Sequence, residues 1–163
     1  MNFSIEKEVL LNLLLEHNKV VPIRTTLPIL SSAFFGIEKN SLKIKTTNLD
    51  QTIISNTKIK DEEEGAVAIP MQKLVEIVSA LPCEEIKITA NNDFLIEINS
   101  KSGTYKLTGR ATEDFPETTN QKTTGKISLP GKTLLDIINK TAYAASKDDL
   151  KPALTGVYFN LKE

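Results

Sequence analysis

Hydrophobic positions near the start of the chain recur with the spacing of an amphipathic helix. A short apolar strand at residues 3–5 leads into this helix. Its buried stripe is predicted to consist of Leu10, Leu13, Leu14, His17, Val20 and Val21, widened by Leu11 and Leu15. We expect Pro22 to end the helix, because proline supplies no backbone N–H. His17 is the only histidine, and its place in the stripe favours a hydrogen-bonded packing role over that of a ligand or a base.

A period of two replaces the helical period after this stretch and predicts three strands. The strands are centred on residues 33–38, 42–45 and 53–54, with turns at 39–40 and 48–50. In the second strand Leu42 and Ile44 alternate with lysines, as expected of a strand that is buried on one face only. The acidic run 61–64 is interpreted as a solvated loop.

This order of strand, helix and three strands occurs twice and begins a third time. Without any gap, Phe3, Ile5, Leu10 and Leu14 correspond to Val67, Ile69, Leu74 and Val78, and these in turn to Ile127, Leu129, Leu134 and Ile138. Likeness between the first and third units continues beyond the helix, where Pro28, Leu30, Phe34 and Phe35 correspond to Pro152, Leu154, Tyr158 and Phe159. Such repetition predicts a fold built from copies of one supersecondary unit.

The repeats predict the domain organisation. Units 3–64 and 65–116 are expected to form one α+β domain within residues 1–120, with antiparallel sheets. The polar stretch 117–124 is interpreted as a linker, because it contains no apolar residue. Residues 121–163 are expected to be the incomplete start of a second domain. We therefore expect the chain to be a fragment of a longer protein.

Composition bounds the function further. The chain has 163 residues and a formal net charge of −1, so its total charge gives no argument for nucleic-acid binding. No apolar run reaches the length of about 18 residues typical of a membrane span, and no leader is evident. The single cysteine, Cys83, cannot form an intramolecular disulfide and is expected to pack in a reducing compartment. Together these features predict a soluble cytoplasmic protein without a membrane partner.

The residues alone point to no enzyme, cofactor or metal site. One histidine and one cysteine give no confident Ser-His-Asp or Cys-His set, and the glycines form no phosphate-binding loop. The exposed faces of the three expected helices carry charges of both signs, at Glu8, Asn12, Glu16, Lys19, Gln72, Lys73, Glu76, Lys132, Asp136, Asn139 and Lys140. On charge alone these faces are ordinary solvated surfaces. One function that remains is a stand-alone β-rich module that binds protein partners through a strand edge.

Several short stretches, taken in order, resemble a known family. They are MNFSIEKEVLL at the start, RTTLPIL at 24–30, TNLD at 47–50, VAIP at 67–70, DFP at 114–116 and KPALTGV at 151–157. Together they resemble the bacterial DNA polymerase III beta subunit, the sliding clamp. The resemblance implies the DNA-clamp fold, in which subunits of three two-unit domains form a homodimeric ring, with antiparallel sheets outside and helices on the inner face.

The resemblance also implies a function. A clamp is a non-catalytic processivity factor of DNA replication that encircles double-stranded DNA without sequence preference and needs no cofactor or metal. Its implied partners are DNA, the DNA polymerase III alpha subunit and the clamp loader.

Individual residues inherit expected roles from this resemblance. Arg24 matches a family arginine that contacts DNA. Gln72 falls where some members have a DNA-contacting arginine, with Lys73 beside it. Asp148 falls where some members have a DNA-contacting glutamine, and its acidic side chain disfavours a phosphate contact. Leu154 matches the edge of the pocket that receives partner peptides. The edge strand expected at the dimer interface consists of Thr104, Tyr105, Lys106, Leu107 and Thr108.

Overall fold

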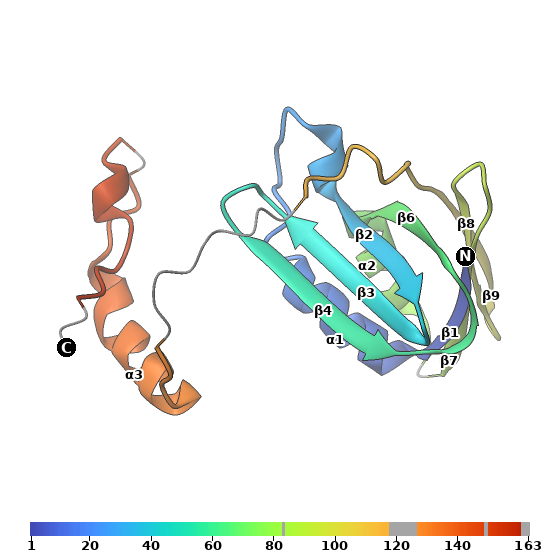
Figure 1. Ribbon diagram of the computed structural model, residues 1–163, viewed down its shortest axis with the longest axis horizontal. Coiled ribbons are helices and arrows are strands. Elements are labelled where there is room, and N and C mark those ends of the chain that lie inside the picture. The colour runs from blue at the N-terminus through green and yellow to red at the C-terminus, as the bar shows by residue number, and fades with distance from the viewer. Residues whose placement is uncertain (83, 118–126, 149, 161–163) are drawn as a thin grey trace. The chain divides into compact units, whose positions relative to one another are not determined.

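The computed structural model describes residues 1–82, 84–117, 127–148 and 150–160. The chain divides into two compact units, Met1–Thr119 and Asn120–Glu163 (Figure 1). The expectations for Cys83 and for linker residues 118–124 lie outside the described residues. No helix in the described part of the chain is long and apolar enough to cross a membrane.

The first unit contains the two complete repeats. The first repeat consists of β1 (Asn2–Glu6), α1 (Lys7–His17), the short 3-10 helix η1 (Pro28–Ser31), β2 (Ser32–Glu38), β3 (Ser41–Thr47) and β4 (Thr52–Lys58). After β5 (Lys60–Glu63), the second repeat consists of β6 (Gly65–Pro70), α2 (Met71–Ala80), β7 (Glu85–Ala90), β8 (Leu95–Ser100) and β9 (Gly103–Thr108). The predicted order of strand, helix and three strands is therefore confirmed in both repeats.

The two repeats exchange their first strands. The nine strands form two antiparallel sheets with the orders β5-β1-β7-β8-β9 and β4-β3-β2-β6. Strand β1 pairs with β7 of the second repeat, where Phe3 lies opposite Ile88. Strand β6 pairs in the same way with β2 of the first repeat, where Val67 lies opposite Phe35. Neither repeat therefore completes a sheet by itself.

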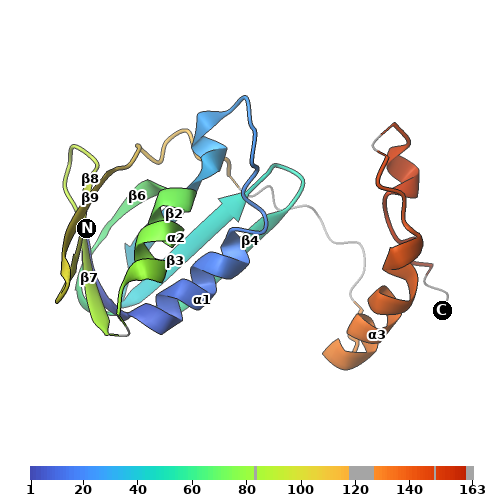
Figure 2. The ribbon, with the colours of Figure 1, turned by 180° about the vertical axis from the view of Figure 1, so that it is seen from behind.

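Helices α1 and α2 lie side by side over one face of the two sheets (Figure 2). Their inward stripes meet in a single hydrophobic core, to which Leu10, Leu14, Leu74 and Val78 each contribute a fully buried side chain. Each such side chain contributes roughly 1.5–3 kcal/mol by its removal from water. The predicted stripe of the first helix is thus confirmed for Leu10, Leu14 and His17, which are buried. Leu15 is 46% exposed, and Val20 and Val21 lie beyond the end of α1.

Two expected boundaries in the first repeat are wrong. Helix α1 ends at His17 rather than at Pro22. The N–H groups of Lys19 and Val20 donate to the carbonyl oxygens of Glu16 and His17, at 3.2 and 3.1 Å. These tighter bonds, from each residue to the carbonyl three positions earlier, close the helix before the proline.

The acidic run 61–64 is largely a strand rather than a loop. Strand β5 pairs with β1 across an irregular register, with Asn2 opposite Glu63 and Ser4 opposite Lys60. The pairing satisfies backbone groups of β1, whatever the side chains of β5 are. Charged residues are common on such edge strands because they discourage further pairing. Because the residues of this run are charged, the pattern of alternating apolar positions did not predict a strand here.

The second unit contains α3 (Gly131–Thr141) and the 3-10 helices η2 (Ala142–Ala144) and η3 (Pro152–Leu154). The strands expected around 127–129 and 158–159 are not formed in the part of this unit that the structure describes. In the first unit, the strands that correspond to residues 127–129 are β1 and β6, and each pairs with a strand of the other repeat. The strand that corresponds to residues 158–159 is β2, which pairs with β3 of its own repeat and with β6 of the other. Correspondingly, no residue of α3 is buried, and Leu135 is 57% exposed.

Candidate nucleic-acid and subunit interfaces

Arg24 lies on a connection that distinguishes the first repeat from the second. Residues 18–31 join α1 to β2, whereas residues 81–84 alone join α2 to β7. Arg24 is exposed on this connection, and its neighbour Ile23 is 92% exposed. The hydroxyl of Thr25 accepts the N–H of Leu27 at 3.0 Å. The connection therefore carries an arginine that is free to reach a ligand from an ordered backbone.

His17 joins the start of this connection to the strands beneath it. Its ring is fully buried; Nδ1 lies 2.8 Å from the hydroxyl of Thr46 on β3, and Nε2 lies 3.0 Å from the hydroxyl of Ser55 on β4. Burial lowers the pKa of His17, against a smaller opposing effect of Glu16. The expected hydrogen-bonded packing role is confirmed, although no pattern in the sequence indicates that Thr46 and Ser55 are its partners.

Gln72 and Lys73 lie in the first turn of α2 and are both exposed. Lys73 Nζ lies 3.7 Å from Glu76 Oε2, and the two side chains are 69% and 68% exposed. An exposed pair of this kind contributes little stability and leaves the ammonium accessible to a phosphate. The exposed faces of α1 and α2 thus combine acidic, basic and uncharged residues, as the sequence predicts.

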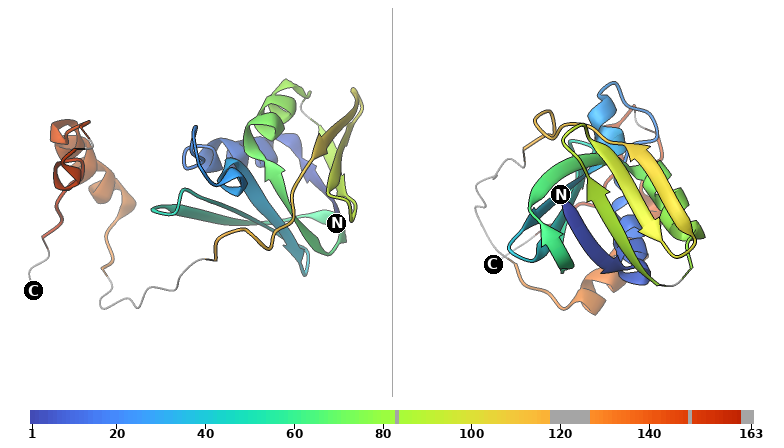
Figure 3. Two further views of the ribbon diagram at one scale, coloured as in Figure 1. Left: turned by 90° about the horizontal axis from the view of Figure 1, so that it is seen from above. Right: turned by 90° about the vertical axis from the view of Figure 1, so that its right-hand side faces the viewer.

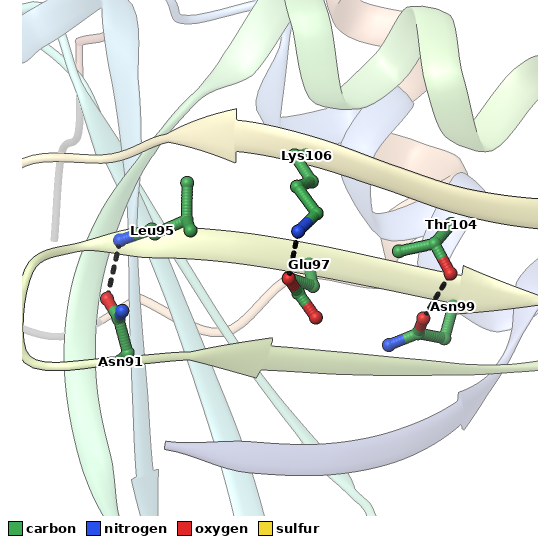
Figure 4. Close-up of polar contacts among 6 residues, drawn as sticks. All are labelled: Asn91, Leu95, Glu97, Asn99, Thr104 and Lys106. Atoms are coloured by element: carbon green, nitrogen blue, oxygen red, sulfur yellow. Dashed lines mark hydrogen bonds and ion pairs between the residues drawn. The ribbon is translucent and has the colours of Figure 1, made fainter.

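Strand β9 forms one edge of its sheet, and no described residue pairs with its outer side. Figure 4 shows how side chains attach it to β8. The hydroxyl of Thr104 donates to Asn99 Oδ1 at 2.7 Å, and Lys106 Nζ lies 2.8 Å from Glu97 Oε1. At the far end of β8, the N–H of Leu95 donates to Asn91 Oδ1 at 2.9 Å. The first two contacts hold β9 against β8, and the backbone groups on the outer side of β9 have no strand partner among the described residues.

The second unit holds the two remaining predicted residues. Asp148 is exposed, but its Oδ1 accepts the N–H of Leu150 at 3.0 Å, so the carboxylate organises a turn. Leu154 is 56% exposed and lines a hollow of about 350 Å³ together with Thr141 and Tyr158. Within the described residues there is no group of three or more His, Cys, Asp or Glu side chains that could hold a metal ion.

The strand-exchanged pair of repeats, with two helices side by side over antiparallel sheets, defines the DNA-clamp fold. Sequence comparison then identifies the family within that fold. The N-terminal domain of the DNA polymerase III beta subunit matches residues 1–120, and the chain belongs to this family.

Relatives cover the rest of the chain as well. A beta sliding clamp of Chlamydia pneumoniae is 28% identical over 96% of this chain and 43% of its own length. A beta sliding clamp of Staphylococcus epidermidis is 29% identical over 100% of this chain and 45% of its own. The crystal structure of the DNA polymerase III subunit beta from Pseudomonas aeruginosa is 26% identical, with a TM-score of 0.89 over 96% of this chain and 43% of that one. The chain thus spans less than half the length of these relatives.

Proposed function

We propose that this chain is part of a processivity factor of the bacterial replicative DNA polymerase, a ring that encircles duplex DNA and tethers the polymerase to it. Membership of the beta subunit family supports this function most directly. The ring needs no catalytic group of its own, because residence on DNA depends on topology. The exposed edge of β9 supports a closed ring, since pairing between domains removes strand edges.

In this proposal, residues 1–120 are the first clamp domain and residues 121–163 begin the second. The full protein is a homodimer in the cytoplasm, and its partners are double-stranded DNA, the DNA polymerase III alpha subunit and the clamp loader. The edge of β9 pairs with the other subunit. Leu154 forms the rim of a pocket for partner peptides.

Arg24 is the proposed DNA contact, with Gln72 and Lys73 as weaker contributors. The mixed charge of the helix faces suits this role. A ring that must slide needs weak phosphate contacts that are independent of sequence, whereas a continuous basic stripe would hold the DNA in place.

The test compares circular and linear DNA. The protein that carries this chain is loaded by the clamp loader onto a nicked circular plasmid, which is then cut once with a restriction enzyme. A ring stays on the circle and is lost within minutes of the cut, as gel filtration of the labelled protein would show. Equal retention on both forms would exclude a ring and favour the module that binds partners through a strand edge.

A further inference from the structure

The chain leaves the first unit by crossing the outer face of a sheet. After β9, the backbone of Arg110 pairs with that of Ala68 on β6 through two hydrogen bonds, of 2.8 and 3.0 Å. Residues 110–117, here called the strap, then pass over β2 and β3 on the side away from α1 and α2 (Figure 3). The alternation of β2 agrees with this arrangement, because Phe35 is buried in the core and Phe34 points to the opposite face.

The end of the strap is held by one lysine. Lys45 lies opposite Phe34 in the pairing of β2 with β3. Its Nζ donates to the carbonyl oxygen of Pro116 at 2.7 Å. The same ammonium lies 4.9 Å from the ring centroid of Phe115 and 5.5 Å from that of Phe34, and the two rings are 5.8 Å apart. One cation thus binds a backbone carbonyl and the faces of two aromatic rings.

The environment of Lys45 shows that it is more than a solvated surface residue. Phe115 is 5% exposed, so it fills a site on the sheet. Burial lowers the pKa of Lys45, with a further lowering by Lys43 and an opposing effect of Glu117. The partial desolvation of the ammonium is compensated by the carbonyl and the rings. Lys43, on the same strand, is exposed and makes no hydrogen bond or ion pair to the described part of the strap.

We propose that Lys45 is a positioning residue that fixes where, and in which direction, the chain leaves the first unit. The strap has one anchor at Arg110 and a second at Phe115 and Pro116, and Lys45 supplies the second. The biological role that we give to Lys45 rests on the proposed function. A ring closes only if each domain starts at a defined position relative to the domain before it. Its structural content is independent of DNA.

The experiment measures the position of the strap end within the first unit. Two spin labels are placed on Asp93→Cys, in the exposed turn before β8, and on Glu117→Cys, immediately after Pro116, in a Cys83→Ser background. Distance distributions are recorded for the whole chain with Lys45, with Lys45→Met, and with Lys45→Arg. Methionine keeps an unbranched apolar stem but loses the charge and the donor, whereas arginine keeps both. Lys43→Met is the matched control.

A narrow distribution is expected with Lys45, and one at least twice as broad with Lys45→Met. Lys45→Arg and Lys43→Met should stay narrow. A melting curve of each variant separates anchoring of the strap from stabilisation of the first unit. A lower Tm for Lys45→Met with an unchanged distance distribution overturns the proposal. Equal broadening of the distance distribution by Lys43→Met also overturns it. If Lys45→Met fails to fold, Lys45→Gln takes its place under the same criteria. No DNA is present, so this result is independent of whether the protein encircles DNA.

Discussion

At the scale of single residues, the resemblance of the stretch RTTLPIL to the family proposed Arg24 as a DNA contact, and the structure shows that this position has no equivalent in the second repeat. The connection that carries Arg24 has no counterpart of similar length in the second repeat. The hydroxyl partners of His17 and the carbonyl partner of Lys45 come from segments far away in the sequence. No local pattern could have revealed those contacts, because they depend on how the strands and the strap are assembled.

Arg24→Ala is expected to weaken association with DNA and to leave folding unchanged, because Arg24 is exposed and outside the core. Loss of one phosphate contact should reduce the slope of log Kd against log salt by about one. Fluorescence anisotropy on a short duplex at several salt concentrations measures both. Lys101→Ala, which removes an exposed cation from the turn between β8 and β9, serves as the control. Equal behaviour of the two variants would remove Arg24 from the proposed interface.

His17 predicts a dependence of stability on pH. Its pKa is lowered in the folded state, so the unfolded chain binds a proton first as the pH falls. The contribution of neutral His17 to the stability of the fold is therefore fully present above the unfolded pKa of 6.5. It is lost as the pH falls from 6.5 toward the lower pKa of the folded state. Urea unfolding at pH 7.5 and 5.5 measures the free energy of unfolding, and the difference between the two pH values should be smaller in His17→Gln than in the unchanged protein. An identical dependence in both would contradict the assignment.

At the scale of elements, alternation and helical spacing predicted the elements of both repeats well. These two patterns gave wrong element boundaries where backbone hydrogen bonds, rather than apolar side chains, determine the structure. Strand β5 is acidic but pairs with β1, and α1 ends in a tight turn before Pro22. The exchange of β1 and β6 between the sheets was equally invisible, because a repeat in the sequence shows which units are alike and not how they pair.

Leu14 and Leu15 test the burial pattern of α1. The side chain of Leu14 points from α1 into the core and is fully buried, whereas its neighbour Leu15 is 46% exposed. Leu14→Ala should lower the free energy of unfolding by about 2–5 kcal/mol, and Leu15→Ala by roughly 1 kcal/mol or less. Chemical denaturation of the two variants measures the difference. Similar losses would mean that the helix is buried around more of its surface than the structure shows.

At the scale of the whole molecule, the repeats in the sequence predicted that residues 121–163 begin a third copy of the unit. The family match covers residues 1–120, and α3 repeats the apolar positions of α1 and α2 without burying any of them. The proposed interfaces at β9 and Leu154 were inferred from the resemblance. Physical reasoning from the residues alone reached only an exposed strand edge.

A chain that ends at residue 117 is expected to fold independently, because every strand of both sheets lies within it. Its Tm should lie within a few degrees of that of the 163-residue chain. A peptide of residues 127–160 should show little helix by circular dichroism, because an isolated helix as short as α3 is marginal in water. A large loss of stability on truncation would show that the first unit depends on contacts with the second.

The exchange of first strands also determines the order in which the protein can fold during synthesis. Strand β1 is translated before its partners β5 and β7, which follow only after residues 59 and 84. At a synthesis rate of about 5–20 residues per second, this delay is on the order of ten seconds. For that time Phe3 and Ile5, which are buried in the finished core, have no sheet to join. The nascent chain is then open to chaperones, and to the matching strand of a neighbouring nascent chain on the same messenger RNA.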